Sequence, residues 1–183
     1  MGKRNRSAMP PMEIRRLTED DAQLFYDFRM LALETDPFSF VESPGELLQI
    51  PVSVYAERLR AGNAENFVFG AFDQRALVGS VGFYQEIPAK RRHKGHIWGV
   101  FVIPSARRQG IARALMVQAI AAARATPGLE QIFLTVSVTQ QAARNLYQSL
   151  GFRSFGVEPC GIRVGGLSVD EQHMLLELPS AAG

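Results

Sequence analysis

The stretch Val100–Leu115, V-F-V-I-P-S-A-R-R-Q-G-I-A-R-A-L, contains an apolar strand, a short basic loop with a glycine, and the start of a helix. The first turn of a helix has backbone N–H groups without intrahelical partners and carries partial positive charge, so it favours a bound anion. Arg107 and Arg108 precede the turn, Gly110 allows the backbone to come close, and the small Ala112 leaves the first turn unobstructed. We therefore expect a diphosphate to bind at this loop. The alternative is an ordinary strand-to-helix connection with two solvated arginines.

The composition is that of a globular domain. The chain has 183 residues, of which 46% are hydrophobic and 21% charged, and its formal net charge is +2. This length is enough for one substantial core, and the net charge is too small to indicate nucleic acid or an anionic membrane as a partner. We expect a single domain over residues 12–178, a disordered tail over residues 1–11 that includes the basic Lys3–Arg6, and a short tail over residues 179–183.

The sequence also bears on the cellular compartment. No segment reaches the roughly 18 uninterrupted apolar residues of a membrane span, and the basic N-terminal residues lack the apolar run of a signal peptide. The single cysteine, Cys160, cannot form an internal disulfide. These features are typical of a cytoplasmic protein, which is the location we expect.

Hydrophobic periodicity and turn residues predict the order of helices and strands. Strands are expected at residues 13–17, 66–72, 77–85, 96–102, 131–138, 152–164 and 167–178, and helices at residues 22–33, 52–60, 111–124 and 140–150. This order describes an α+β fold, an α/β sandwich in which a mixed, mostly antiparallel central sheet of about seven strands is flanked by about four helices.

The patterns also predict which faces are buried. The helix at 111–124 is nearly all apolar, so we expect it to be buried on most of its circumference. The strand at 131–138 is an almost continuous apolar run, which indicates cover on both faces. The apolar face of the first helix is expected to contain Leu24, Phe28 and Leu31.

A second motif lies at residues 143–152, which read A-R-N-L-Y-Q-S-L-G-F. Together with Arg107-x-x-Gly110-x-Ala112, this segment resembles the two hallmarks of the GNAT superfamily of acyl-CoA-dependent N-acetyltransferases. Their consensus patterns are Gln/Arg-x-x-Gly-x-Gly/Ala and Ala-x-x-Leu-Tyr-x-x-x-Gly-Phe. Both motifs occur in the family's order with a suitable separation, and the resemblance covers roughly residues 12–178.

The resemblance implies the GNAT fold, with acyl-CoA in a cleft where the strands at 96–102 and 131–138 splay apart. It also implies that an acetyl group passes from acetyl-CoA to a primary amine of a small molecule or peptide, directly in a ternary complex. The alternative is a non-catalytic acyl-CoA-binding regulatory module. We expect neither nucleic acid nor a membrane as partner, and a homodimer formed through the exposed sheet edge remains open.

The same resemblance implies roles for individual residues. Tyr147 occupies the position of the general acid that protonates the departing thiolate, although an aromatic residue packed on the sheet would give the same pattern. Backbone N–H groups exposed by a bulge around Val100 and Phe101 would polarise the thioester carbonyl, and Gly99 directly before them is typical of a bulge. The positions implied to contact the acyl donor are Val100, Phe101, Val102, Arg107, Arg108, Gln109, Gly110, Ile111, Ala112, Arg113, Gln140 and Asn145.

The base that deprotonates the amine is not assigned by these motifs. A lysine-like amine is neutral in only about one molecule in two thousand at neutral pH, so a base or a chain of waters is useful. His96 stands at the start of a strand where some family members carry a glutamate, but a hydrogen-bonded histidine at a strand end is the plainer interpretation. Glu86 and His93 are weaker alternatives. Gln140 departs from the asparagine that many members have seven residues before the tyrosine.

The acceptor is not identified either. It would be selected by residues 35–51, 86–95 and 161–168, where the sequence carries the least information. Phe38 and Phe40 either line a substrate pocket or pack under their loop. The basic run Lys90–Lys94 is a solvated loop or part of the rim of the active site, and no metal is expected.

Overall fold

The structure, a computed structural model, describes residues 12–179. Residues 1–11 and 180–183 lie outside the described residues, and with them the predicted N-terminal tail, including Lys3–Arg6, and nearly all of the C-terminal one. The strands are β1 (Glu13–Arg16), β2 (Asn66–Asp73), β3 (Ala76–Gln85), β4 (Lys94–Val102), β5 (Gln131–Ser137), β6 (Arg153–Val164) and β7 (Leu167–Glu177). The α-helices are α1 (Ala22–Thr35), α2 (Pro44–Leu47), α3 (Val52–Arg60), α4 (Ile111–Arg124) and α5 (Gln141–Ser149).

The seven strands form one mixed sheet in the order β1-β2-β3-β4-β5-β7-β6. The β4–β5 pair is parallel, and each of the other neighbouring pairs is antiparallel. The crossover that a parallel pair requires is made by α4, which returns the chain to the same end of the sheet. The predicted architecture and almost all of its element boundaries are confirmed to within about two residues, the margin at which assignments of element ends ordinarily differ.

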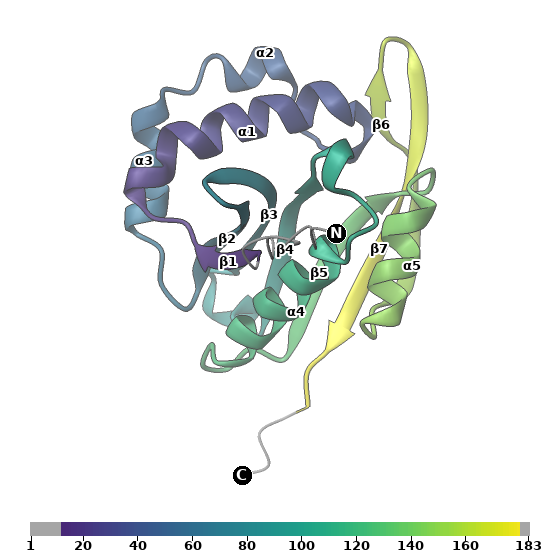
Figure 1. Cartoon of the computed structure of the whole chain (residues 1–183). Helices are drawn as coiled ribbons and strands as arrows, with labels where there is room; N and C mark the ends of the chain where they lie inside the picture. Colours follow the sequence, from purple (N-terminus) through teal and green to yellow (C-terminus); the bar gives the residue numbers. More distant parts are fainter. Residues whose placement is uncertain (1–11, 180–183) are drawn as a thin grey trace, which may run out of the picture.

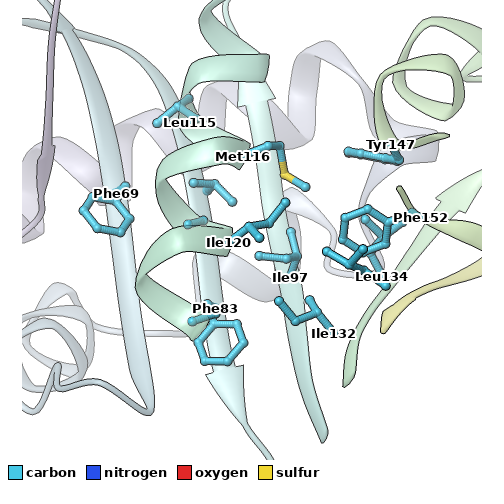
Figure 2. Close-up of a cluster of buried hydrophobic side chains, with 14 of the residues drawn as sticks. Phe69, Phe83, Ile97, Leu115, Met116, Ile120, Ile132, Leu134, Tyr147 and Phe152 are labelled. Atoms are coloured by element: carbon cyan, nitrogen blue, oxygen red, sulfur yellow. The ribbon is translucent and has the colours of Figure 1, made fainter. Parts of the chain in front are cut away.

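Two apolar clusters hold the layers together, one on each face of the sheet. On one face α1 and α3 pack through Phe25, Leu33 and Tyr55. On the other face Met116 and Ile120 of α4 pack against Ile97 and Ile132 of the sheet (Figure 2). Figure 1 shows α1, α2 and α3 on one side, and α4 and α5 on the other. Among the described residues, no helix is long and apolar enough to cross a membrane.

The prediction for the first helix was wrong about its buried face. Leu24 and Leu31 are 38% and 43% exposed, whereas Phe25, Phe28 and Arg29 are buried. The buried stripe is therefore shifted by one residue, because the large ring of Phe25 fits between Tyr55 and Trp98, with ring centroids 5.8 and 6.4 Å away. A charged residue, Arg29, is thereby placed inside the fold.

Two elements are less buried than the sequence predicts, and one helix was not predicted. Helix α4 is buried on one face only, and Val117 on its other side is 50% exposed. Strand β5 buries Ile132 and Leu134 against α4, but Thr135 on its opposite face is exposed. The unpredicted helix is the four-residue α2, which starts with a Ser43–Glu46 capping box.

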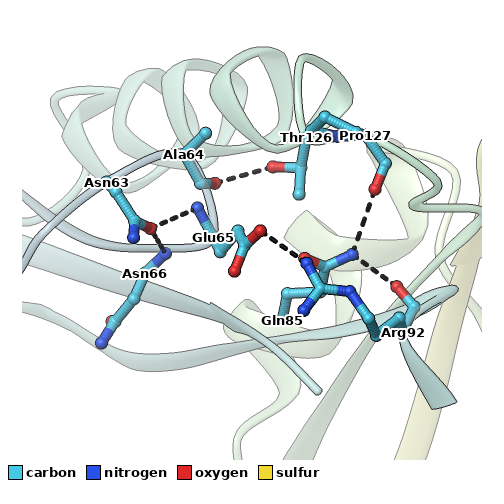
Figure 3. A network of polar contacts seen from close by, with 8 residues as sticks. All are labelled: Asn63, Ala64, Glu65, Asn66, Gln85, Arg92, Thr126 and Pro127. Carbon is cyan, nitrogen blue, oxygen red and sulfur yellow. Dashed lines mark hydrogen bonds and ion pairs between the residues drawn. The ribbon is translucent and has the colours of Figure 1, made fainter. Parts of the chain in front are cut away.

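A network of polar contacts fixes the loop between β3 and β4, where most of the run Lys90–Lys94 lies (Figure 3). Arg92 donates to Glu65 at 2.5 Å, and Gln85 donates to the backbone carbonyl oxygens of Arg92 and Pro127. Arg91 pairs with Glu86 at 2.5 Å. The run Lys90–Lys94 thus has two of its cations paired with carboxylates, and it lines neither of the cavities described below.

Candidate active site

Strand β4 contains a bulge. Gly82 of β3 pairs with Trp98 and Ser80 pairs with Phe101, so Gly99 and Val100 together face the single residue between those two partners. Gly99 has a φ of +61°, in the left-handed region that favours glycine. The bulge expected around Val100 and Phe101 is therefore present, one residue earlier than expected, and the positive φ of Gly99 is the reason for a glycine at this position.

Strands β4 and β5 separate just before the bulge. Their ladder consists of three pairs and ends at His96 and Phe133. The gap between the strands opens into a cavity of about 440 Å³, which we call the donor cavity, since its walls include the bulge and the basic loop. The residues predicted to contact the acyl donor that line it are Val100, Phe101, Val102, Arg107, Arg108, Gly110, Ile111, Ala112, Arg113 and Gln140, and Tyr147 lines it as well. Gln109 and Asn145 are not among its lining residues, and Asn145 instead accepts a hydrogen bond from Gln141.

The basic loop leads into the N-terminus of α4. Arg108 and Gly110 both have positive φ, +63° and +80°. Gly110 is the N-cap residue of α4, so no side chain at this position occupies the N–H groups of the first turn. Apart from Gly110, its chain neighbours and the backbone of α4, no described atom lies within 4 Å of the position where a Cβ of Gly110 would stand, so this end of the helix is open. Arg107 donates to the carbonyl of Val102 at 2.9 Å and pairs with Asp36, so its side chain holds the loop in shape.

Tyr147 of α5 reaches the donor cavity from the opposite wall. Its side chain is buried against Phe152, with 6.1 Å between the ring centroids, and its hydroxyl forms no hydrogen bond with the rest of the described chain. Burial raises the pKa of the Tyr147 phenol well above its usual value. The hydroxyl therefore stays protonated through the physiological range and is available as a donor to whatever occupies the cavity.

A second cavity of about 620 Å³, the acceptor cavity, lies on the α1 side of the sheet. Its walls include Phe25, Arg29 and Tyr55 from the helices, and the buried Phe40 from the loop before α2. Phe40 is thus a lining residue, whereas Phe38 is not. The two cavities share the wall formed by Ser39, Ile97, Trp98, Gly99, Leu134 and Thr135, so they meet at the bulge where β4 and β5 part.

His96 lies in the acceptor cavity and not in the donor cavity. Its Nε2 is 3.0 Å from Glu86 Oε1, and its ring stacks between Tyr84 and Phe133. Tyr147 and His96 therefore line different cavities. His93, Glu86 and the exposed Cys160 line neither cavity.

The comparisons with known proteins identify the family of the chain. The sequence model described as the acetyltransferase (GNAT) family matches residues 25–152, which is more than half of the chain. The chain belongs to the GNAT acetyltransferase family. The family expectation and the GNAT fold are both confirmed, and the family's acyl donor is acetyl-CoA.

Two curated N-acetyltransferases are similar in sequence to part of this GNAT protein. Human N-acetyltransferase 8 is 30% identical over 112 residues, which are 61% of this chain and 49% of that protein. N-alpha-acetyltransferase 30 of Schizosaccharomyces pombe is 30% identical over 105 residues, 57% of this chain and 69% of that protein. The chain thus spans about half the length of the human relative.

Solved structures share the fold at lower identity. A GNAT acetyltransferase from Streptococcus pneumoniae has a TM-score of 0.83 with 24% identity, and the match covers 92% of this chain and 100% of that one. A protein from Salmonella typhimurium, solved with acetyl-CoA, has a TM-score of 0.78 with 20% identity, covering 94% of this chain and 96% of that one.

A charge placed at Gly110 should test the anion site of this GNAT protein. We expect Gly110→Asp to weaken acetyl-CoA binding about tenfold or more relative to Gly110→Asn, because a carboxylate within several ångströms of a diphosphate repels it by about 1–4 kcal/mol. Asparagine has the same shape and tolerates positive φ equally well, so it controls for the backbone. Equal dissociation constants for the two variants, measured by calorimetry, would place the diphosphate elsewhere.

Proposed function

We propose that this protein transfers an acetyl group from acetyl-CoA to a primary amine, directly in a ternary complex. The observation that carries the proposal is the junction of the two cavities at the Gly99–Val100 bulge. A donor bound in one cavity and an amine bound in the other would meet there, and neither would have to leave before the other enters.

The chain supplies a group for each requirement of the transfer. The open N-terminus of α4 would hold the pyrophosphate of the donor, and backbone N–H groups at the bulge would donate to the thioester oxygen. Tyr147 would give its proton to the departing sulfur. Although burial makes this phenol a weak acid, the sulfur leaves into the same desolvated space, where a thiolate is also poorly stabilised and takes a proton more readily.

The amine requires a proton acceptor on the other side of the junction. His96 is the group that we propose for this role, because it lines the acceptor cavity and its Nε2 contacts Glu86 at 3.0 Å. The contact with Glu86 would hold the imidazole ring in place and fix which ring nitrogen is left for the amine.

The pH dependence of His96→Gln should reveal this role. At neutral pH we expect kcat/KM to fall by about 10²-fold, the lower end of general-base contributions. The deficit should shrink as the pH rises, since a growing fraction of the amine is then already neutral and needs no base. Initial rates from pH 6.5 to 10 give the profile, and a deficit that stays constant over this range would assign His96 a purely structural role.

The second candidate function is an acyl-CoA-binding regulatory module, and a direct assay separates the two. The test measures thiol release from acetyl-CoA with amino acids, polyamines, aminoglycosides and peptide N-termini as acceptors. Thiol release that depends on one class of amine supports the transferase. Tight acetyl-CoA binding without amine-dependent thiol release across the whole panel would favour the module.

A further inference from the structure

Arg29 of α1 is a buried cation inside the acceptor cavity. It is 6% exposed, and its Nη2 donates to Glu42 Oε2 at 3.0 Å. Its Nε and Nη1 are buried and have no hydrogen-bond partner among the described residues. Because buried donors of a charged group are strongly unfavourable when unpaired, these two N–H groups are suited to an acceptor that a ligand brings.

The position of Arg29 relates it to the reaction. Its Nη1 is 3.5 Å from the point where a Cβ of Gly99 would stand, and Gly99 begins the bulge where the cavities meet. A ligand group held by Arg29 therefore lies close to the amine that would attack at the bulge. The guanidinium also lies beside two aromatic rings, with its Cζ 5.0 Å from the Phe40 centroid and 5.8 Å from the Trp98 centroid.

The chemistry of these donors favours a carboxylate. A guanidinium presents its N–H groups in a planar fork that matches a carboxylate, and the hydrogen bonds between them are charge-assisted. In a free α-amino acid the carboxylate and the amine are bonded to the same carbon atom, so a carboxylate held at Arg29 keeps the amine beside it, near Gly99. A peptide N-terminus has an amide carbonyl at that point and no charge.

We propose that the acceptor is a free amino acid whose carboxylate is bound by Arg29 and whose α-amine is directed at the bulge. This assignment rests on the proposed acetyl transfer and names its substrate class. The rings of Phe25, Phe40 and Tyr55 favour an apolar side chain, and a volume of about 620 Å³ is ample for one.

The first experiment compares acceptors that differ only in the carboxylate. After a screen of the common amino acids, the best one is offered as the free acid, as its carboxamide and as the first residue of a tripeptide. We expect kcat/KM to be about 10- to 100-fold higher for the free acid, as one or two charge-assisted hydrogen bonds would give. Equal or better turnover of the carboxamide or the tripeptide overturns the proposal but leaves acetyl transfer intact. Failure of every amine would overturn the proposed function itself.

The second experiment uses two variants whose effects should have opposite signs. Arg29→Gln should abolish the preference for the free acid. Glu42→Gln removes the anion that competes for Arg29, and it should lower the KM of the free acid several-fold without a matching change for the carboxamide. If the Arg29–Glu42 pair only held the loop before α2 in place, both variants would impair both acceptors alike, which would overturn the proposal.

A binding measurement keeps the test independent of turnover and of one variant's folding. Calorimetry of the wild-type protein with CoA present should show tighter binding of the N-acetyl amino acid than of its amide. If Arg29→Gln does not fold, Arg29→Lys keeps the charge but loses the fork, and it should retain only part of the preference. Equal affinity for acid and amide in the wild-type protein would contradict the proposal.

Discussion

Replacing Tyr147 with phenylalanine should lower kcat by about 10²- to 10⁴-fold, the range that a general acid contributes, while acetyl-CoA binding changes little. The hydroxyl has no hydrogen-bond partner among the described residues, so its removal leaves no partner unsatisfied and the packing against Phe152 is kept. Single-turnover rates and donor calorimetry measure the two quantities. A kcat within twofold of the wild-type value across the pH range would remove the general-acid assignment.

The free energy of unfolding of Tyr147→Phe should also depend less on pH above about pH 10 than that of the wild-type protein. Because burial raises the pKa of Tyr147, the unfolded chain loses this proton near pH 10 while the folded chain keeps it. The unfolded state then binds fewer protons, so the free energy of unfolding falls as the pH rises above about 10, by up to about 1.4 kcal/mol per pH unit. Tyr147→Phe should lose less stability than the wild-type protein over this interval, and urea unfolding at pH 9 and 11 would show the difference. Parallel losses would mean that the phenol titrates freely in the folded state.

Gly99→Val should lower kcat by about 10²- to 10³-fold, the loss that follows removal of one donor to a developing oxyanion. Valine is strained at the φ of +61° that the bulge requires, so the backbone is expected to relax toward a regular strand and redirect the N–H of Val100. Donor affinity should change less than kcat, because the basic loop and the open end of α4 are untouched.

Gly128→Val is the matched control for this strain. Gly128 has a φ of +71°, no atom lies within 4 Å of its would-be Cβ, and it lines neither cavity. Both variants should lose about 1–3 kcal/mol of stability, but only Gly99→Val should lose turnover. Equal kcat values for the two variants would show that the bulge has no part in the transfer.

The donor side of the site could be predicted from sequence because its chemistry lies in the backbone of contiguous segments. The strand, the Arg108–Gly110 turn and the start of α4 follow one another in the chain, so their spacing alone indicates the cradle. Tyr147 is carried by a second contiguous motif. Gln109 and Asn145 failed to reach the donor cavity because a motif specifies a segment but not which of its side chains faces inward.

The acceptor side could not be predicted because its residues come from segments that are distant in sequence. Arg29 belongs to an amphipathic helix, where an arginine ordinarily indicates the solvent-facing side. It is buried because the buried face of α1 is shifted by one residue from the predicted face. The bond to Glu42 depends on how the loop before α2 folds back over that helix. A signal was present in the Ser43-Pro44-x-Glu46 start of α2, which fixes that loop. The homodimer and the cytoplasmic location remain predictions.

Two cavities meet at the Gly99–Val100 bulge, and we propose that an acetyl group passes there from the ligand of one to the ligand of the other. The most direct test incubates the wild-type protein and Tyr147→Phe, each saturated with acetyl-CoA, with the amine panel, and follows thiol release and the mass of the amine together. We predict one acetylated amine for each thiol released by the wild-type protein, and a rate lower by at least about 10²-fold for the variant. Saturating acetyl-CoA binding with no acetylated amine would rule out the proposed transfer, and equal rates for the two proteins would rule out Tyr147 as its general acid.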